Sequence, residues 1–460
     1  MIVRTPAGDV RGEPIATGVP FRGIPYAAAP EGALRFAEPV PAPSWTGVRD
    51  AREAGPTAPQ RHREIPGLDL TALVGPGWRP GAEYLTVDVW TPDPGATGLP
   101  VLVFVHGGAF LGGTGSAPVY DGTAFTRGGA VLVTVQYRLG VEGFLPLEGG
   151  ATNLGLRDQL AALRWVQDSI AAFGGDPGNV TLFGESAGAV SVACLLGSPL
   201  ATGLFRRAVV QSGHANMVRG RAELDRLAKV VAENLGVEPR AEAFRALTAE
   251  QLLGAQDAVL RPGAAPDLRD DEGRDRSHGL SPFLPLVGDD VLPVHPGQAI
   301  RNGAGADVDL IAGTCREEML LYFAPTGILD TLTEEQAVDM LSATHPDAAG
   351  VLRAYGLGER RPGDVLVDAM TDLVFRDGVE ELVESHQGRT FRYEFEWRSP
   401  RLGACHGVEL PFVFDSLPAA ASLVGDDAPA ELAREVNAAW TRFAATGSPG
   451  WPEDTTTRLG

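Results

Sequence analysis

The chain has 460 residues and a formal net charge of −21 at pH 7. This charge argues against nucleic acid or an anionic membrane surface as a partner, because both require clustered cations. The content of 44% apolar and 21% charged residues is typical of a globular protein. No run of 18 apolar residues suggests a membrane span.

The N-terminus and the cysteines bear on the location of the protein. The first ten residues, MIVRTPAGDV, have neither the basic nor the apolar region of a secretory signal. The three cysteines, Cys194, Cys315 and Cys405, lack metal-ligand spacing. We therefore expect a cytoplasmic protein, a monomer or homodimer, without a metal or other cofactor.

Six segments between residues 100 and 400 are predicted to be strands. In five of them the apolar residues are consecutive, as expected for a parallel sheet covered on both faces. These five are residues 100–108, 130–138, 179–186, 206–213 and 307–314. Residues 391–397 instead alternate apolar and polar side chains, which indicates a strand nearer the sheet edge.

Helical patterns separate these strands. Apolar residues recur every three or four positions from Leu156 to Phe173 and again from Leu432 to Phe443. Strands that alternate with helices predict an α/β fold with a mostly parallel sheet.

Two stretches, roughly 215–280 and 325–388, carry helical patterns without strand signals. We expect them to be helical insertions that form a cap or rim. No linker divides the chain, so residues 1–460 are expected to form a single domain.

The segment TLFGESAGAV places Ser186 between Gly184 and Gly188, after a predicted strand and before a predicted helix. This is the context of the G-x-S-x-G turn, which presents a reactive serine hydroxyl at the top of a sheet. A serine needs a base, and the base needs an orienting acid. In this arrangement the chain order is serine, acid, histidine.

His406, in a glycine-flanked loop after the last predicted strand, occupies the place expected for the base. Glu317 and Glu318 follow another strand, between Ser186 and His406, and either is a candidate for the acid. Spacing alone does not choose between these two carboxylates, and both also fit the solvated first turn of a helix.

Glycines after the strand at 100–105 suggest donors for a tetrahedral oxyanion. The backbone N–H groups of Gly107, Gly108 and Ala109 are available there, and that of Ala187 follows the serine. Two glycine motifs in this order favour an acyl-transfer site over a chance pair of tight turns.

Taken together, the chain resembles the type B carboxylesterases of the α/β-hydrolase superfamily, the group that includes the cholinesterases. The resemblance covers nearly the whole chain and rests on many matches in order. They include residues 21–36, 85–92, 105–113, 135–145, 153–189, 203–213, 283–293, 405–414 and 438–449.

The resemblance implies a role for each candidate residue. Ser186 would be the nucleophile, His406 the base and Glu318 the acid, with Gly108, Ala109 and Ala187 as the oxyanion donors. Three further residues would support this machinery, with Ser212 and Glu409 around the histidine and Glu185 behind the serine loop.

The chain also departs from the family pattern. Tyr84 stands where the family has a disulfide cysteine, so that disulfide is absent. The acid that usually pairs with the arginine at position 35 is replaced by Ala82, and Glu83 is expected to substitute for it. The region 61–82, which shapes the rim of the site, is shortened.

We therefore expect a serine carboxylic-ester hydrolase that acts on small-molecule esters. The alternatives are an acyltransferase or thioesterase with the same three residues and, from another class, a catalytically inactive cholinesterase-like binding module. An apolar substrate pocket would use five residues that are equally explicable as core. They are Phe110, Phe283, Leu284, Leu286 and Phe412.

Overall fold

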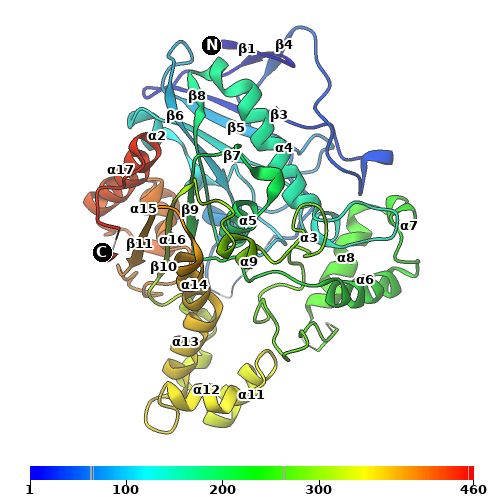
Figure 1. The fold of residues 1–460 in the computed structure, drawn as a ribbon, viewed down its shortest axis with the longest axis vertical. Coiled ribbons are helices and arrows are strands. Elements are labelled where there is room, and N and C mark those ends of the chain that lie inside the picture. Colours follow the sequence, from blue (N-terminus) through cyan, green and yellow to red (C-terminus); the bar gives the residue numbers. More distant parts are fainter. Residues whose placement is uncertain (63–64, 66, 262, 265, 454) are drawn as a thin grey trace.

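The computed structural model describes residues 1–460 except 63–64, 66, 262, 265 and 454. A nine-stranded sheet runs through the molecule in the order β12-β11-β10-β9-β8-β6-β7-β5-β3 (Figure 1). Neighbouring strands are parallel from β12 to β7, and β5 is antiparallel to both of its neighbours. The strands are β3 (Val19–Pro25), β5 (Thr86–Thr91), β6 (Leu99–Val105), β7 (Val131–Val135), β8 (Gly175–Glu185), β9 (Arg207–Gln211), β10 (Asp309–Cys315), β11 (Thr390–Phe395) and β12 (Thr456–Leu459).

All six predicted strands are present, and β11 alternates buried and half-buried residues next to the edge strand β12, as predicted. The sheet extends further than the sequence patterns indicated, because β3, β5 and β12 lie outside residues 100–400. A small second sheet near the N-terminus contains β1 (Ile2–Thr5), β2 (Gly8–Arg11) and β4 (Val48–Asp50).

Helices cover both faces of the sheet, which explains the consecutive apolar residues of its central strands. In β6, Val101, Val103 and Val105 pack in one apolar cluster, whereas Leu102 and Phe104 pack in the other. Helices α4 (Leu154–Ser169) and α5 (Ala187–Leu196) cover the first face, and α17 (Ala430–Thr446) covers the second.

The two stretches expected as insertions are helical. Helices α11 to α13 project from the body of the molecule at the bottom of Figure 1. We call the segment from α11 to α14 the helical lobe. The helices of the first stretch are α6 (Arg221–Leu235), α7 (Ala241–Arg245) and α8 (Ala249–Leu260). Those of the lobe are α11 (Glu334–Ser342), α12 (Ala348–Ala354), α13 (Pro362–Thr371), the π-helical turn Asp372–Arg376 and α14 (Asp377–Ser385).

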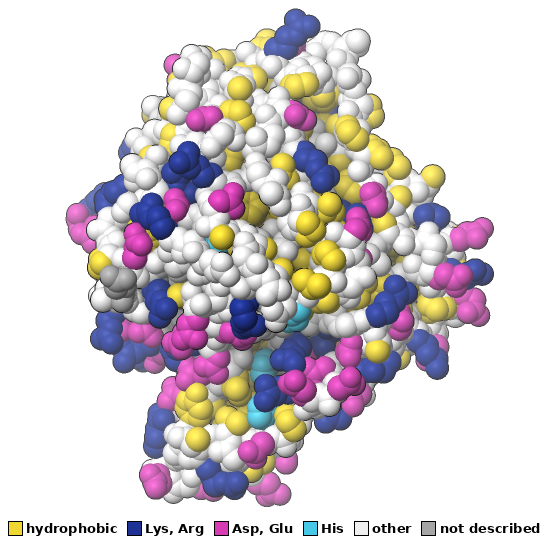
Figure 2. Space-filling model, in the orientation of Figure 1, with side chains coloured by type: hydrophobic (Ala, Val, Ile, Leu, Met, Phe, Trp, Pro, Cys, Tyr) yellow, Lys and Arg dark blue, Asp and Glu magenta, His cyan; other side chains and the backbone are white. Residues whose placement is uncertain are grey.

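Short helices fill the remaining connections. They are α1 (Thr71–Val74), α2 (Thr123–Arg127), α3 (Gly140–Phe144), α9 (Pro296–Arg301), α10 (Leu320–Phe323), α15 (Leu410–Val413) and α16 (Ala421–Val424). Within the described ranges, no helix has both the length and the apolar content to cross a bilayer. On the face drawn in Figure 2, basic side chains are interspersed with acidic ones.

Candidate active site

Ser186 lies at the junction of β8 and α5 in a backbone conformation that is unfavourable for any residue with a side chain. Its φ is 55° and its ψ is −124°. The flanking glycines allow this turn to be tight. A Cβ on Gly188 would lie 2.0 Å from the carbonyl oxygen of Val105, so only glycine lets α5 approach β6 this closely. Ser186 is half-buried, while Glu185 and Ala187 beside it are buried.

His406 and Glu318 are in direct contact. The Nδ1 atom of His406 lies 2.6 Å from Oε2 of Glu318, and the Glu318 side chain is completely buried. The other carboxylate oxygen, Oε1, accepts hydrogen bonds from the Ser212 hydroxyl at 2.6 Å and the Cys315 N–H at 2.7 Å. Glu318 therefore has a fixed orientation, and its carboxylate favours the tautomer of His406 that carries a proton on Nδ1.

Glu317 points elsewhere, although it is adjacent to Glu318. Its Oε1 accepts a hydrogen bond from Arg398 at 2.6 Å, and its Oε2 accepts one from the N–H of Ala404 at 3.0 Å. Of the two carboxylates that spacing left open, Glu318 is thus the one in contact with the histidine.

Two aromatic rings lie close to the imidazole of His406. The Phe375 ring, from the π-helical turn of the lobe, lies 4.6 Å from it, centroid to centroid. The Tyr322 ring of α10 lies 5.8 Å from it. These contacts restrict the positions that the imidazole can occupy.

Glu185 lies close to the other side of the imidazole, with its Oε1 atom 3.1 Å from Nε2 of His406. Burial raises the pKa of Glu185 to about 8. Burial alone would lower the pKa of His406, but the charges of Glu185 and Glu318 outweigh it and raise the pKa to about 9. Glu185 also packs behind the loop that follows β6 and contains Gly107, Gly108 and Ala109, which we call the glycine loop. A Cβ on Gly107 would lie 2.7 Å from Oε2 of Glu185.

Glu409 lies near this group without a hydrogen bond to the imidazole. It accepts a hydrogen bond from the Cys315 thiol at 2.8 Å and a long one from Gln211 at 3.4 Å. Burial, followed by the charge of Glu318, raises the pKa of Glu409. Cys315 and Cys405 are free thiols, and burial raises both of their pKa values well above the usual range, which makes them weak nucleophiles.

The glycine loop after β6 faces the same cavity as Ser186 and His406. Gly108 and Ala109 both line this cavity, and their φ angles are 110° and 56°. A Cβ on Gly108 would lie 2.1 Å from the carbonyl oxygen of Gly112, so the loop requires glycine there. Ala187 is the first residue of α5, directly after Ser186.

The cavity has a volume of about 160 Å³ and a mostly apolar lining. Its polar side chains are those of Ser186, His406 and Glu185, and two tyrosines also line it. The apolar and aromatic lining residues are Ile65, Leu70, Leu73, Val74, Tyr120, Leu280, Leu321, Tyr322 and Leu410.

The five residues predicted to form the pocket do not line this cavity. Phe110, Phe283, Leu284, Leu286 and Phe412 are all buried in the apolar clusters. Phe110 packs on Phe144 and Phe412 packs on Phe395, because these side chains fill the layers beneath the site.

The actual lining residues were missed by the sequence reasoning. Leu321 and Tyr322 follow Glu318 directly, so their nearness to the acid was a usable signal. Ile65, Leu70, Leu73 and Val74 come from the shortened region, which the resemblance placed at the rim of the site, but no pattern there singled out individual residues.

A second expectation needs correction. Arg35 pairs with Glu142 at 2.5 Å and not with Glu83, which pairs with Arg49 at 2.7 Å. The Tyr84 hydroxyl also donates to Glu142, at 3.0 Å. Glu83 was expected because it is adjacent to Ala82, the position of the family's acid. In the fold, α3 instead brings Glu142 against Arg35.

Comparisons with known proteins show which family the chain belongs to. The model of the carboxylesterase family matches residues 1–457. The chain is 37% identical to para-nitrobenzyl esterase of Bacillus subtilis (strain 168), covering 98% of this chain and 92% of the relative. It is 33% identical to phenmedipham hydrolase of Pseudarthrobacter oxydans, covering 97% and 90%.

Solved structures give the same result. A carboxylesterase from Geobacillus stearothermophilus superposes with a TM-score of 0.85 at 34% identity, over 100% of this chain and 96% of that one. The protein belongs to the carboxylesterase family and is a carboxylic-ester hydrolase with the α/β-hydrolase fold.

Proposed function

We propose that the protein hydrolyses uncharged, apolar carboxylic esters through an acyl-enzyme, with Ser186, His406 and Glu318 as its catalytic triad. The observation that carries this proposal is the 2.6 Å contact of Glu318 with His406, which lines the same cavity as the strained Ser186.

The first half of the reaction forms the acyl-enzyme. His406 accepts the proton of the Ser186 hydroxyl as the oxygen attacks the ester carbonyl, and Glu318 stabilises the resulting imidazolium. The N–H groups of Gly108, Ala109 and Ala187 donate to the oxyanion of the tetrahedral intermediate. His406 then protonates the leaving alcohol.

Water completes the cycle. With the alcohol gone, His406 takes a proton from a water molecule as the water oxygen attacks the acyl carbon, and it then gives this proton to the Ser186 oxygen as the carboxylic acid leaves. The mostly apolar lining of the cavity supports the assignment to uncharged esters, because it offers little to replace the hydration of a charge, and an anionic substrate would also meet the carboxylate of Glu185. A cytoplasmic location stays a prediction.

Stopped-flow hydrolysis of p-nitrophenyl acetate, butyrate and octanoate tests the proposal. Ser186→Ala should abolish the p-nitrophenol burst and lower kcat by about 10⁶. Ser191→Ala is the matched control, because Ser191 is a buried serine in α5, the helix that begins directly after Ser186, and its hydroxyl donates to the carbonyl of Ala187. It should keep most of the activity.

Turnover that survives in Ser186→Ala would overturn the assignment of the nucleophile. Wild-type protein inactive on all three esters would favour the binding module. Product analysis with added alcohols separates hydrolysis from acyl transfer, which uses the same three residues.

A further inference from the structure

An irregular segment between α8 and residue 283 contributes Leu280 to the wall of the catalytic cavity. We call residues 267–281 the Leu280 segment. It contains no helix or strand, so no regular ladder of hydrogen bonds fixes its path. Its position must therefore depend on other contacts.

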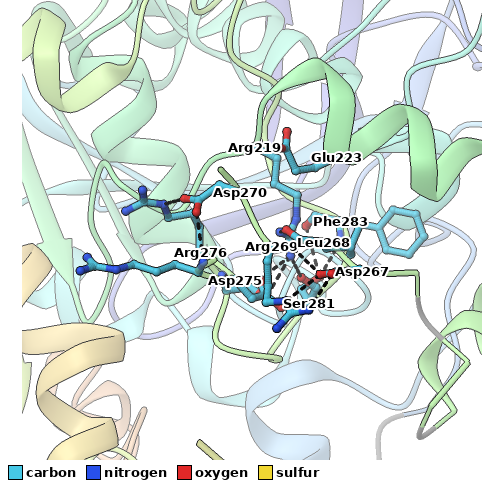
Figure 3. Close-up of polar contacts among 12 residues, drawn as sticks. Arg219, Glu223, Asp267, Leu268, Arg269, Asp270, Asp275, Arg276, Ser281 and Phe283 are labelled. Atoms are coloured by element: carbon cyan, nitrogen blue, oxygen red, sulfur yellow. Dashed lines mark hydrogen bonds and ion pairs between the residues drawn. The ribbon is translucent and has the colours of Figure 1, made fainter. Parts of the chain in front are cut away.

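The main contact is the guanidinium group of Arg219, which is buried with 3% of the residue exposed. Its Nη1 donates to the carbonyl of Leu268 at 2.8 Å. Its Nη2 forms an ion pair with Asp275 at 2.7 Å and lies 3.2 Å from both the Ser277 hydroxyl and the Ser281 carbonyl oxygen. Figure 3 shows Leu268, Asp275 and Ser281 gathered around the end of the Arg219 side chain.

Arg219 is itself fixed in the body of the protein. Its N–H donates to the carbonyl of Pro285 at 2.9 Å, and its carbonyl accepts from the N–H of Val287 at 2.9 Å. The guanidinium of a well-anchored residue thus holds an irregular segment through four residues. They are Leu268, Asp275, Ser277 and Ser281.

Two of these four residues enclose Leu280 in the sequence. The hydroxyl of Ser277 and the carbonyl of Ser281 both contact Arg219, and the N–H of Leu280 donates to the carbonyl of Ser277 at 3.0 Å. Asp275 also accepts hydrogen bonds from the N–H and hydroxyl of Ser277, at 2.9 and 3.0 Å. Leu280 can therefore shift little unless these contacts break.

The segment also contacts the helical lobe. The N–H of Asp275 donates to the carbonyl of Thr344, between α11 and α12, at 3.0 Å. The Arg219–Asp275 pair thus lies where the body, the lobe and the cavity wall meet.

We propose that Arg219 is a positioning residue for ester selectivity, which acts by holding Leu280 in the wall of the catalytic cavity. This inference rests on the proposed function, because it requires that the hydrocarbon chain of an ester substrate contacts Leu280 in the catalytic cavity. Only an arginine supplies a planar, permanently charged group with enough donors for these acceptors. A lysine at this position keeps the charge but cannot reach all of these acceptors at once, because its donors lie on a single nitrogen.

The test compares Arg219→Lys, Leu280→Ala and the double variant. For each, kcat/KM is measured on p-nitrophenyl acetate, butyrate and octanoate and on acetate esters of alcohols of increasing length. For each series we compare the kcat/KM of the longest ester with that of the shortest, as a long-to-short ratio. We expect Leu280→Ala to change this ratio about tenfold in one series, the size of effect typical of a lost apolar contact. Arg219→Lys should change the same ratio in the same direction, and the double variant should differ little from Leu280→Ala.

Arg226→Met is the matched control. Arg226 lies on α6 and donates to the carbonyls of Asp267 and Arg269, at 2.8 and 3.0 Å, so it holds the far end of the same segment. It should leave both series unchanged. If Arg219→Lys does not fold, Asp275→Asn removes the charge of the partner with little change of shape, and should alter the same ratio to a smaller degree.

A ratio that responds to Leu280→Ala but not to Arg219→Lys or Asp275→Asn would overturn the inference. So would fully additive effects, or the absence of any response to Leu280→Ala. Inactivity of the wild-type protein on every ester would instead refute the proposed function.

Discussion

The two sides of the catalytic cavity are built in different ways. On one side, Ser186, the glycine loop and His406 lie where the strands of the large sheet end, and buried hydrogen bonds fix Glu318 and, through it, His406. On the other side, the wall includes the apolar side chains of Ile65, Leu70, Leu73, Val74, Leu280 and Leu321. Leu73 and Val74 belong to the four-residue helix α1 and Leu321 to the four-residue helix α10, whereas Ile65, Leu70 and Leu280 lie outside helices.

This difference separates the reaction from the choice of substrate. Changes on the sheet side displace reacting atoms, where small displacements have large effects on rate. Changes on the wall side alter contacts with the ester chain, and the loss of such a contact has a far smaller effect on the rate. Mutations on the two sides should therefore differ in both the size and the kind of their effect.

The largest effect is expected from Glu318→Gln. The amide would direct an N–H donor at Nδ1 of His406, which favours the wrong tautomer and leaves Nε2 unable to accept the serine proton. We expect kcat on p-nitrophenyl butyrate to fall by about 10³–10⁴. Glu317→Gln is the matched control, since Glu317 contacts Arg398 and Ala404 instead, and it should change kcat by less than about threefold. Equal losses in the two variants would contradict the assignment of the acid.

A smaller effect, on pH dependence, is expected from Glu185→Gln. His406 must be neutral to accept a proton, so kcat/KM rises as the pH rises through the pKa of His406. The carboxylate of Glu185, 3.1 Å from Nε2, helps to raise that pKa to about 9. Without this charge the pKa falls, and the acid limb of the kcat/KM profile should move to lower pH by about one unit.

Glu317→Gln again serves as the control and should leave the acid limb of the kcat/KM profile at the wild-type pH. An acid limb that stays at the wild-type pH in Glu185→Gln would show that this carboxylate does not act on the reacting histidine.

The sheet side was predictable from the sequence because its geometry needs particular residues. Only glycine fits at positions 184 and 188, and valine-rich strands covered on both faces leave a recognisable pattern. The strands that were not predicted lack such a pattern. β3 contains two prolines and a register shift between Phe21 and Ile24, and β12 is a short polar strand at the sheet edge.

The wall side was not predictable, and the reason is physical. A helix of four residues such as α1 is too short to show a periodic apolar face, so Leu73 could not be told from an ordinary core residue. Which of two adjacent carboxylates reaches His406, or whether Glu83 or Glu142 reaches Arg35, depends on packing between distant segments. Sequence spacing does not contain that information.

The smallest effect is expected from Leu73→Ala, on the wall side. Leu73 lines the cavity, whereas Leu68, in the same region and with the same 7% exposure, does not. Each truncation should lower the free energy of unfolding by about 2–3 kcal/mol, because each removes a buried leucine side chain. Only Leu73→Ala enlarges the cavity, so only it should change the ratio of kcat/KM for octanoate and acetate, by about three- to tenfold, with kcat on acetate nearly constant. Equal ratios in the two variants would mean that α1 does not contact the ester chain, and selectivity would then have to come from the Leu280 segment and α10.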